Sequence, residues 1–544
     1  MKKLFLTAVT LLAAITSGMA CTNLIVGKAA SADGSVIVSY SADSYGMYGY
    51  LCHYPAAMHA EGTWREVYDW ETGRYTGRIP EAAQTYNVIG NINEHQVTIA
   101  ETTFGGREEL VNPEGIIDYG SLIYIALQRA KTAREAIDVM TSLVEEYGYN
   151  SGGESFSIAD PNEVWIMEMI GKGPEQKGAV WVAVRIPDDC IAAHANQARI
   201  RQFPLKDKKN CLYSKDVIKF AREKGYFEGK DAEFDFAAAY CPADFGGLRY
   251  CDARVWSYFN MFVDGMDQYL PWAMGDASAT PMPLYIQPKQ KVSVRDVQNA
   301  MRDHYEGTPM DITGDLGAGP WSMPYRPSPL SFKVDDKTYF NERPISTQQT
   351  AFTFVSQMRS HLPNAIGGVL WFGTDDANMA VFTPVYCCTN VVPECYKREK
   401  ADPVTFSAES AFWLFNMVSN MVYPRYSALI GDLKKVQLAC EDDFAANQAA
   451  VEAKAMELYA DNPPKAVAML TQYTAETAMS TMAAWGNLAK FLIVKHNDMV
   501  VKPEENGVFK RIETGEAVSP VRPGYPEHFN RRVAGETGER YLMK

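Results

Sequence analysis

The chain has 544 residues, of which 47% are hydrophobic and 22% are charged, and its formal net charge at pH 7 is −14. This is the composition of an ordinary globular protein that is long enough to bury one large core or two moderate ones. The negative charge argues against nucleic acid or an anionic membrane surface as a partner, and it suits a cationic or zwitterionic ligand.

The first twenty residues have the pattern of an export signal. Lys2 and Lys3 form a basic start, an apolar run follows, and the segment closes on small residues up to Ala20. We therefore expect residues 1–20 to be a signal peptide that signal peptidase removes, and the mature protein to be periplasmic or extracellular. No later stretch approaches the roughly 18 apolar residues of a membrane span, so the sequence predicts none.

A cut after Ala20 would make Cys21 the first residue of the mature chain. A terminal cysteine carries both a thiol, with a pKa of about 8.5, and a free α-amine, with a pKa of about 8. The amine can accept the thiol proton and later return it to a leaving group, as in terminal-threonine hydrolases. In the uncut chain this nitrogen is a non-basic amide, so export would also activate the enzyme.

Two other interpretations of Cys21 remain open at this point. A signal can end beside a cysteine by chance, and bacterial lipoproteins carry a lipid on a cysteine in this position, which would abolish its nucleophilic chemistry. Such lipoprotein signals usually have an aliphatic residue where this chain has Gly18, and Cys21 is followed by a strand-like apolar run instead of a polar tether. The sequence favours a nucleophile over a lipid-anchored, non-catalytic binding protein.

A β-hairpin is predicted directly after Cys21. Apolar residues at 24–27 and 36–39 flank the turn sequence Ala-Asp-Gly-Ser at 32–35. The hairpin would return the chain to the neighbourhood of Cys21 and bring Asp43 within reach of its amine. The alternative for Asp43 is a solvated loop acid.

The rest of the chain alternates strand pairs with helical stretches, which predicts stacked sheets with helices outside. Strands are predicted at 86–104 (turning at 91–94), 154–170, 180–186 and 350–383. Helices are predicted at 119–147, ended by Gly148, in the charged segment 205–240, and in long runs from about 407 that are interrupted at 462–464. The Gly- and Pro-rich stretch 303–327 predicts an extended loop, and the last forty residues predict an irregular wrap.

Polar residues at predicted strand ends are candidates for a site. Thr103 could meet a substrate through its hydroxyl, although paired threonines at a strand end are more often structural. An apolar strand runs into His194 and Asn196; Asn196 could reach a pocket, and His194 is more consistent with a structural role.

Ten cysteines leave nine besides Cys21, so at least one further thiol is expected to be unpaired. Cys241 with Cys251, or members of the cluster Cys387, Cys388 and Cys395, could form bridges. No pair has zinc-ligand spacing and no HExxH motif occurs, so we predict neither a metal nor another cofactor.

Five pieces of the chain together resemble the dipeptidase A family of cysteine peptidases. They are CTNLIVGKAASADGS, NINEHQVTIAETTFGG, GGESFSIADPNEVWIMEM, HYEGTPMDITGD and IGGVLWFG. The resemblance runs from Cys21 to at least residue 430. The family is related to secernins and, more remotely, to bile-salt and penicillin-V amidases.

The resemblance implies an α+β protein with the four-layer αββα sandwich of N-terminal-nucleophile hydrolases. It divides the chain into a hydrolase domain at 21–404 and a helical C-terminal extension at 405–544 that packs on it and ends in an irregular tail. Cys21 matches the nucleophile, which attacks a peptide carbonyl to give an acyl-enzyme. Asp43 matches an aspartate that steadies the terminal amine or thiol. Many relatives carry Arg or Lys where this chain has Tyr40, which leaves the charge around the thiol open.

By the remoter amidase pattern, Asn196 donates its amide to the oxyanion and Arg254 supports the surroundings of the nucleophile. The amidases have a second asparagine where this chain has Thr103, whose hydroxyl could still donate. One preorganised donor of this kind is worth on the order of 3 kcal/mol in the transition state. The resulting prediction is an exported cysteine dipeptidase acting on dipeptides or short peptides; the alternative is an amide hydrolase of the bile-salt or penicillin-V amidase type. The oligomeric state is left open.

Overall fold

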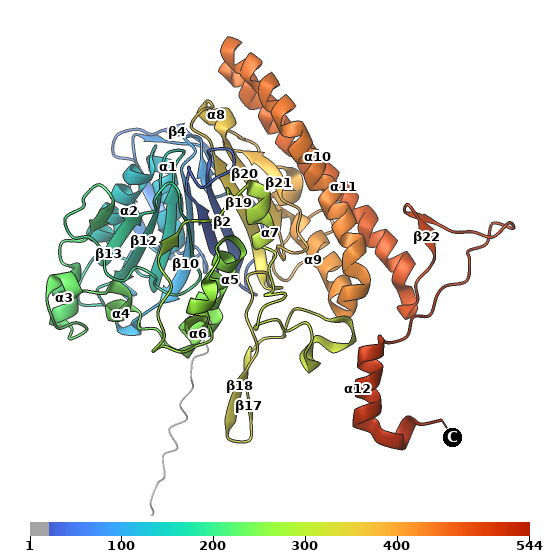
Figure 1. The fold of residues 1–544 in the computed structure, drawn as a ribbon. Helices are drawn as coiled ribbons and strands as arrows, with labels where there is room; N and C mark the ends of the chain where they lie inside the picture. Colours follow the sequence, from blue (N-terminus) through green and yellow to red (C-terminus); the bar gives the residue numbers. More distant parts are fainter. Residues whose placement is uncertain (1–20, 544) are drawn as a thin grey trace, which may run out of the picture.

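Two antiparallel sheets face each other at the centre of the molecule (Figure 1). The computed structural model describes residues 21–543, so the expected signal peptide at 1–20 lies outside the described residues. The seven-stranded sheet has the order β16 (Tyr285–Ile286), β14 (Ile191–His194), β1 (Asn23–Val26), β2 (Val36–Asp43), β19 (Thr350–Met358), β20 (Gly368–Thr374) and β21 (Thr383–Tyr386). The eight-stranded sheet has the order β15 (Cys211–Tyr213), β13 (Ala179–Arg185), β12 (Val164–Gly171), β11 (Gly153–Ala159), β10 (Thr98–Gly105), β9 (Ile92–Asn93), β8 (Val88–Ile89) and β3 (His53–Tyr54).

The predicted hairpin after Cys21 is confirmed. β1 pairs with β2 in a register that places Ile25 opposite Val38, and its other edge pairs with β14. Thr22 and Ser41 continue the pairing, because the Ser41 N–H donates to the Thr22 carbonyl at 3.0 Å. Cys21 is therefore held at the middle of the seven-stranded sheet, close to the end of β2.

Helices cover the outer face of the eight-stranded sheet (Figure 1). The single helix predicted at 119–147 is wrong, because the segment forms two helices, α1 (Tyr119–Arg129) and α2 (Ala133–Tyr147). Ala130 is extended, and the Thr132 side chain accepts a hydrogen bond from the Glu135 N–H as the N-cap of α2. The predicted end at Gly148 is confirmed, with φ at +80°.

A second group of helices lies on the seven-stranded sheet. It comprises α5 (Ala253–Phe262), α7 (Val294–Ala300), α9 (Ala411–Val422), α10 (Tyr426–Asp461) and α11 (Pro463–His496), of which α9 packs on β20 and α11 packs on β21. The predicted interruption at 462–464 is confirmed, since α11 starts at Pro463, a residue that suits a first helical turn because it has no N–H. The α10–α11 pair runs on beyond the sheets (Figure 1).

Three other predicted segments differ in part. The charged segment 205–240 is not continuously helical: it contains β15 and only two short helices, α3 (Val217–Glu223) and α4 (Phe236–Tyr240). In 86–104 the chain reverses between β8 and β9, one residue before the expected turn, and again after β9. The last forty residues do not wrap the body: α12 (Glu527–Thr537) has no buried residue, and the tail swings away from the sheets (Figure 1).

Smaller elements complete the fold. They are β4 (Ala57–Met58) with β7 (Gln84–Thr85), β5 (Trp64–Tyr68) with β6 (Tyr75–Pro80), β17 (Ser331–Val334) with β18 (Lys337–Phe340), β22 (Glu504–Glu505) with β23 (Val508–Phe509), α6 (Leu270–Ala273) and α8 (Asn364–Gly367). The 303–327 stretch is largely irregular as predicted, apart from the short 3-10 turn at Leu316–Trp321.

The ten cysteines are all free, so neither suggested bridge forms. The sulfur of Cys241 faces the Phe104 carbonyl at 3.8 Å, and that of Cys387 faces the Asn364 carbonyl at 3.0 Å, so both thiols are directed at backbone oxygens. Across residues 21–543, no helix has both the length and the apolar character needed to cross a bilayer.

Candidate active site

Cys21 is fully buried at the seam between the two sheets. Its Sγ lies 3.5 Å from Oε1 of Glu101 on β10 and 3.6 Å from the Tyr40 hydroxyl on β2. Burial and the carboxylates of Glu101 and Asp43 raise the pKa of the Cys21 thiol well above its ordinary value, while a hydrogen bond with the Asp43 backbone and the contact with the Tyr40 hydroxyl act in the opposite direction. The sulfur therefore holds its proton at neutral pH unless a base removes it.

Glu101 forms a carboxyl pair with Glu154, the second residue of β11. Burial raises the pKa of Glu101 to about 6 and raises that of Glu154 well above its ordinary value, with the charge of Glu101 adding to the shift of Glu154. The Tyr40 hydroxyl donates to Glu101 Oε1 at 2.5 Å, and the Thr103 hydroxyl donates to Glu154 Oε1 at 2.8 Å. Because each buried charge raises the pKa of the other acid, the pair favours a state with one shared proton and a single negative charge.

Arg254 fixes the backbone of the cysteine. A π-helical turn at Gly247–Asp252 leads directly into α5, whose second residue is Arg254. Its Nη1 donates to the Cys21 carbonyl and to the Thr22 hydroxyl, both at 2.7 Å. Its Nη2 donates to the Asn196 Oδ1 at 2.9 Å. The guanidinium thus links the cysteine to the loop that follows β14.

Asn196 sits in a left-handed backbone conformation, with φ at +66°. This conformation is uncommon for a non-glycine residue, although asparagine tolerates it better than most. The side-chain amide Nδ2 donates to the Thr103 carbonyl at 2.7 Å. The structure thus brings Asn196, Arg254 and Thr103 together beside Cys21. The Thr103 hydroxyl, which the amidase pattern suggested as an oxyanion donor, instead donates to Glu154.

Asp43 is buried as an ion pair and is not a solvated loop acid. Its Oδ2 accepts from Arg343 Nη2 at 2.5 Å and from the Ser41 hydroxyl at 3.0 Å. Its Oδ1 accepts from the Thr350 hydroxyl at 2.6 Å. Asp43 therefore faces the thiol with its backbone N–H, while its carboxylate is bound to the arginine.

His194 has a structural environment. Its Nδ1 and Nε2 are hydrogen-bonded to the hydroxyls of Thr102 (2.7 Å) and Ser157 (2.8 Å). Burial lowers its pKa to about 3, with Arg199 contributing, so the ring is neutral. It links the two sheets and holds the β14 end from which Asn196 follows.

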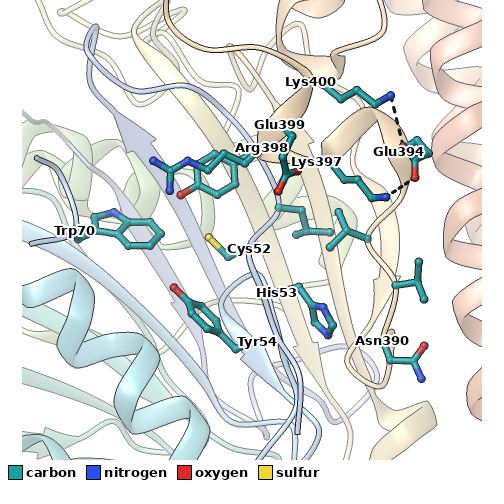
Figure 2. A pocket seen from close by; sticks show the side chains of 14 residues that line it. Cys52, His53, Tyr54, Trp70, Asn390, Glu394, Lys397, Arg398, Glu399 and Lys400 are labelled. Atoms are coloured by element: carbon teal, nitrogen blue, oxygen red, sulfur yellow. Dashed lines mark hydrogen bonds and ion pairs between the residues drawn. The ribbon is translucent and has the colours of Figure 1, made fainter. Parts of the chain in front are cut away.

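Two hollows of the molecule are candidates for a substrate site. The smaller, of about 570 Å³, is lined by Asn196, Arg254 and Arg343 among others and so adjoins the groups that hold Cys21. The larger, of about 800 Å³, is shown in Figure 2 and is lined by Trp70, Cys52 and Arg398 among others. It contains none of the residues predicted from the sequence, so we associate the site with the smaller hollow.

Sequence reasoning missed Glu101, Glu154 and Arg343. Glu101 lies in the quoted piece NINEHQVTIAETTFGG, between apolar residues and threonines of a strand that is buried along most of its length. An acid at such a place is rarely buried without a purpose, which is the signal that could have identified it. Nothing local marks Arg343, which lies 300 residues from Asp43 in the sequence.

Comparison with known proteins supports the resemblance. The model of peptidase family C69 matches residues 20–52 and 49–439. A probable dipeptidase of Salmonella dublin is 29% identical over 409 residues, covering 71% of this chain and 85% of the relative. A probable dipeptidase of Latilactobacillus sakei is 27% identical, covering 88% and 95%, and dipeptidase A of Lactobacillus helveticus is 25% identical, covering 74% and 81%. Because the family match covers most of the chain, this protein belongs to peptidase family C69 and is a cysteine-type peptidase.

Proposed function

We propose that this chain is an exported cysteine dipeptidase that cleaves dipeptides or very short peptides through an acyl-enzyme on a mature N-terminal Cys21. The observation that carries the proposal is the position of Cys21, directly ahead of β1, with its carbonyl held by Arg254 and its sulfur 3.5 Å from Glu101. The proposed substrate class follows that of the relatives, which are named as dipeptidases. Two facing sheets with helices on both outer faces suit the αββα sandwich of N-terminal-nucleophile hydrolases, with 21–404 as the hydrolase domain and 405–544 as its helical extension.

The state of the thiol explains why the α-amine is needed. The thiolate is the attacking form of cysteine, yet the surroundings of Cys21 raise the pKa of its thiol. A terminal α-amine has a pKa of about 8 and is attached to the same residue, so it can take the proton at neutral pH. This group exists only after residues 1–20 are removed.

The proposed reaction has two halves. As Sγ attacks the peptide carbonyl carbon, its proton moves to the Cys21 amine, and the Asn196 amide donates to the developing oxyanion. The C–N bond then breaks, and the leaving amine takes the proton from the Cys21 ammonium. Water next attacks the thioester, gives one proton to the amine, and releases the acid product as the C–S bond breaks and the sulfur regains its proton.

Arg254 and Asp43 act as positioning residues in this scheme. Arg254 joins the Cys21 carbonyl to Asn196, so nucleophile and oxyanion donor keep a fixed spacing. Asp43 holds Arg343 and turns its own N–H towards the thiol. Thr103 supports both neighbours, since its carbonyl accepts from Asn196 and its hydroxyl donates to Glu154.

The first test is the intact mass and N-terminal sequence of the mature protein. A chain that begins at a free Cys21 with no added mass is the expected result. A diacylglyceryl adduct or a retained leader would remove the amine and thiol that the mechanism uses and would contradict it.

The second test is correctly processed Cys21→Ser. We expect dipeptide hydrolysis to fall by about 100-fold or more, because the hydroxyl is a much weaker nucleophile than the thiol. Cys440→Ser, at a half-buried position on α10, is the matched control and should keep the wild-type rate. Asn196→Ala should lower turnover about 100-fold. If the wild type hydrolyses conjugated bile acids but not dipeptides, the proposed function changes from dipeptidase to bile-acid amidase.

A further inference from the structure

Among residues 21–543, no cationic side chain is paired with the two carboxyl groups beside Cys21. Within residues 21–543, no Lys, Arg or His side chain forms an ion pair with Glu101 or Glu154. Both side chains are buried, and in the same part of the chain neither Oε2 atom accepts a hydrogen bond from an N–H or hydroxyl group. A proton shared between the two acids satisfies part of this capacity, yet the net negative charge is left without a positive partner.

Three other buried acids among residues 21–543 have charged or backbone donors, and Asp375, which has no cation, is bonded at both oxygens by Asn416 and Ser419. Glu452 pairs with Arg359 and Asp43 pairs with Arg343, each through an arginine within 3 Å. Glu168 is not ion-paired, but it accepts from two backbone N–H groups, those of Arg199 and Ile200. At these acids the described residues donate to both carboxylate oxygens, whereas at the Glu101–Glu154 pair they supply no cation and leave both Oε2 atoms without an N–H or hydroxyl donor.

We propose that Glu101, supported by Glu154, binds the free α-ammonium of the first residue of the substrate, an inference that rests on the proposed function. In any amino acid the α-nitrogen lies about 2.5 Å from the carbonyl carbon, given the N–Cα and Cα–C bond lengths and the angle between them. In an attack geometry that carbon lies about 3 to 3.5 Å from the nucleophile. A carboxylate oxygen 3.5 Å from Sγ is thus within hydrogen-bonding reach of the ammonium.

The hydrogen bonds around the two carboxyl groups leave oxygen atoms free to accept hydrogen bonds from an ammonium. Tyr40 and Thr103 donate to the two Oε1 atoms, and no N–H or hydroxyl group of residues 21–543 donates to either Oε2, so the Oε2 atoms keep lone pairs beyond the one that a shared proton would use. An ammonium has three N–H donors and one positive charge, which matches two acceptors and one negative charge. The two acids do not line the smaller hollow themselves. Thr103 connects them to it, because it is hydrogen-bonded both to Glu154 and to Asn196, which does line the hollow.

This arrangement would make the site selective for a free amino terminus. A substrate whose α-nitrogen is acylated, or replaced by hydrogen, would bury the charge of Glu101 without a partner. Sites built to bond a charged substrate group reject analogues that lack it more strongly than apolar pockets reject a missing methylene. Cleavage would then follow the first residue of the substrate, which is what a dipeptidase requires.

The α-ammonium of Cys21 itself is the rival occupant. A carboxylate that held this group would raise its pKa and keep its proton in place, which opposes its use as the base. The two occupants predict different responses to the substrate, because only a substrate receptor distinguishes substrates by their amino group.

The experiment compares kcat/KM for an unmodified dipeptide and for its desamino analogue, in which hydrogen replaces the α-ammonium, using correctly processed protein. We expect the wild type to prefer the dipeptide by about 100-fold or more, the size expected for a hydrogen bond to a charged group in a buried site. In Glu101→Gln this preference should fall to within about threefold, through loss of dipeptide hydrolysis and not of analogue hydrolysis. Glu163→Gln, which makes the same change in the turn at the opposite end of β11, should keep the wild-type preference.

Three results would overturn the inference. If Glu101→Gln lowers hydrolysis of both substrates equally, Glu101 acts on Cys21 and not on the substrate amine. If the wild type hydrolyses both substrates equally well, the proposed dipeptidase function stands, but Glu101 does not bind the substrate ammonium. If the wild type hydrolyses neither, the proposed function fails and the inference fails with it.

Discussion

Asp43 and Glu101 are buried acids on different sheets, and both raise the pKa of the Cys21 thiol. Asp43 is saturated by Arg343, Ser41 and Thr350. Among the described residues, Glu101 is bonded by groups that carry no positive charge: the Tyr40 hydroxyl, the thiol itself and Glu154, the acid with which it is coupled. The difference separates two uses of the same chemical group, because a compensated acid holds the scaffold in place whereas an uncompensated one can bind a cation from outside.

The comparison also shows how the site is assembled. Asp43 ends β2 of the seven-stranded sheet and Glu101 lies within β10 of the eight-stranded sheet. Cys21 contacts both, so the two sheets must stack correctly before thiol and carboxylate can meet. Substitutions of the two acids should therefore have opposite signatures: loss of stability at Asp43 and loss of substrate selection at Glu101.

The largest effect on stability is expected from Asp43→Asn. Removing one member of a buried ion pair typically costs about 3 to 5 kcal/mol, because the other charge stays buried. Here the guanidinium of Arg343 would face a neutral amide. Equilibrium unfolding in guanidinium chloride measures the loss. The control is Asp264→Asn, which breaks an exposed pair with Lys289 and should change the free energy of unfolding by about 1 kcal/mol or less. Equal losses in the two variants would contradict the assignment of Asp43 as a scaffold acid.

Glu101→Gln should have the opposite sign. The folded-state pKa of about 6 lies above the ordinary value of about 4.3, so the folded chain binds the proton more tightly than the unfolded chain. The stability that this group contributes is present below pH 4.3 and is lost as the pH rises through 6. Glutamine avoids the buried charge, so the variant should be more stable than the wild type by about 2 kcal/mol at pH 8 and equally stable near pH 4. A loss of stability at pH 8 would show that the carboxylate is compensated after all.

Tyr40→Phe removes the hydroxyl that donates a hydrogen bond to Glu101 but not to Asp43. The Tyr40 hydroxyl lowers the pKa of Glu101 by donating to it, so its removal should raise that pKa by about one unit, given about 1.5 kcal/mol for such a bond. Dipeptide binding to Cys21→Ala, measured by calorimetry, isolates this ionisation from the chemical steps. Affinity should fall as the pH drops through about 6, and the added Tyr40→Phe change should move the midpoint to about pH 7. An unchanged midpoint would exclude Glu101 as the titrating group.

The sequence predicted those parts of this comparison that depend on local patterns. A turn between two apolar runs was enough to predict that β2 would return Asp43 to Cys21, and Pro463 was enough to predict where α10 gives way to α11. The helix break at 130–132 was missed although it has a local signal, since Thr132 followed by Glu135 three residues later is the pattern that starts a helix such as α2.

The quoted motifs did not delimit the predicted site, because Asp43, Asn196 and Arg254 lie outside them, whereas Glu101 and Glu154, which were missed, lie inside them. Cys21, Asp43, Asn196 and Arg254 do converge. The pairing of Glu101 with Glu154 depends on the register of β10 against β11, and that of Asp43 with Arg343 depends on a contact across 300 residues. Neither is encoded in a local periodicity, so these partners appear only when the sheets are assembled.

Glu154→Gln is expected to have the smallest effect on activity. It also distinguishes which member of the Glu101–Glu154 pair carries the negative charge. Burial and the charge of Glu101 raise the pKa of Glu154, which favours its protonated form; in that form it accepts from Thr103 through Oε1 and has a proton to donate to Glu101. A glutamine can do the same, accepting through its carbonyl and donating through its N–H. Dipeptide kcat/KM should therefore stay within about threefold of the wild type, whereas Glu154→Leu, which removes the donor, should lose about tenfold. If Glu154→Gln is as damaging as Glu101→Gln, the negative charge resides on Glu154, and the receptor for the ammonium is the other member of the pair.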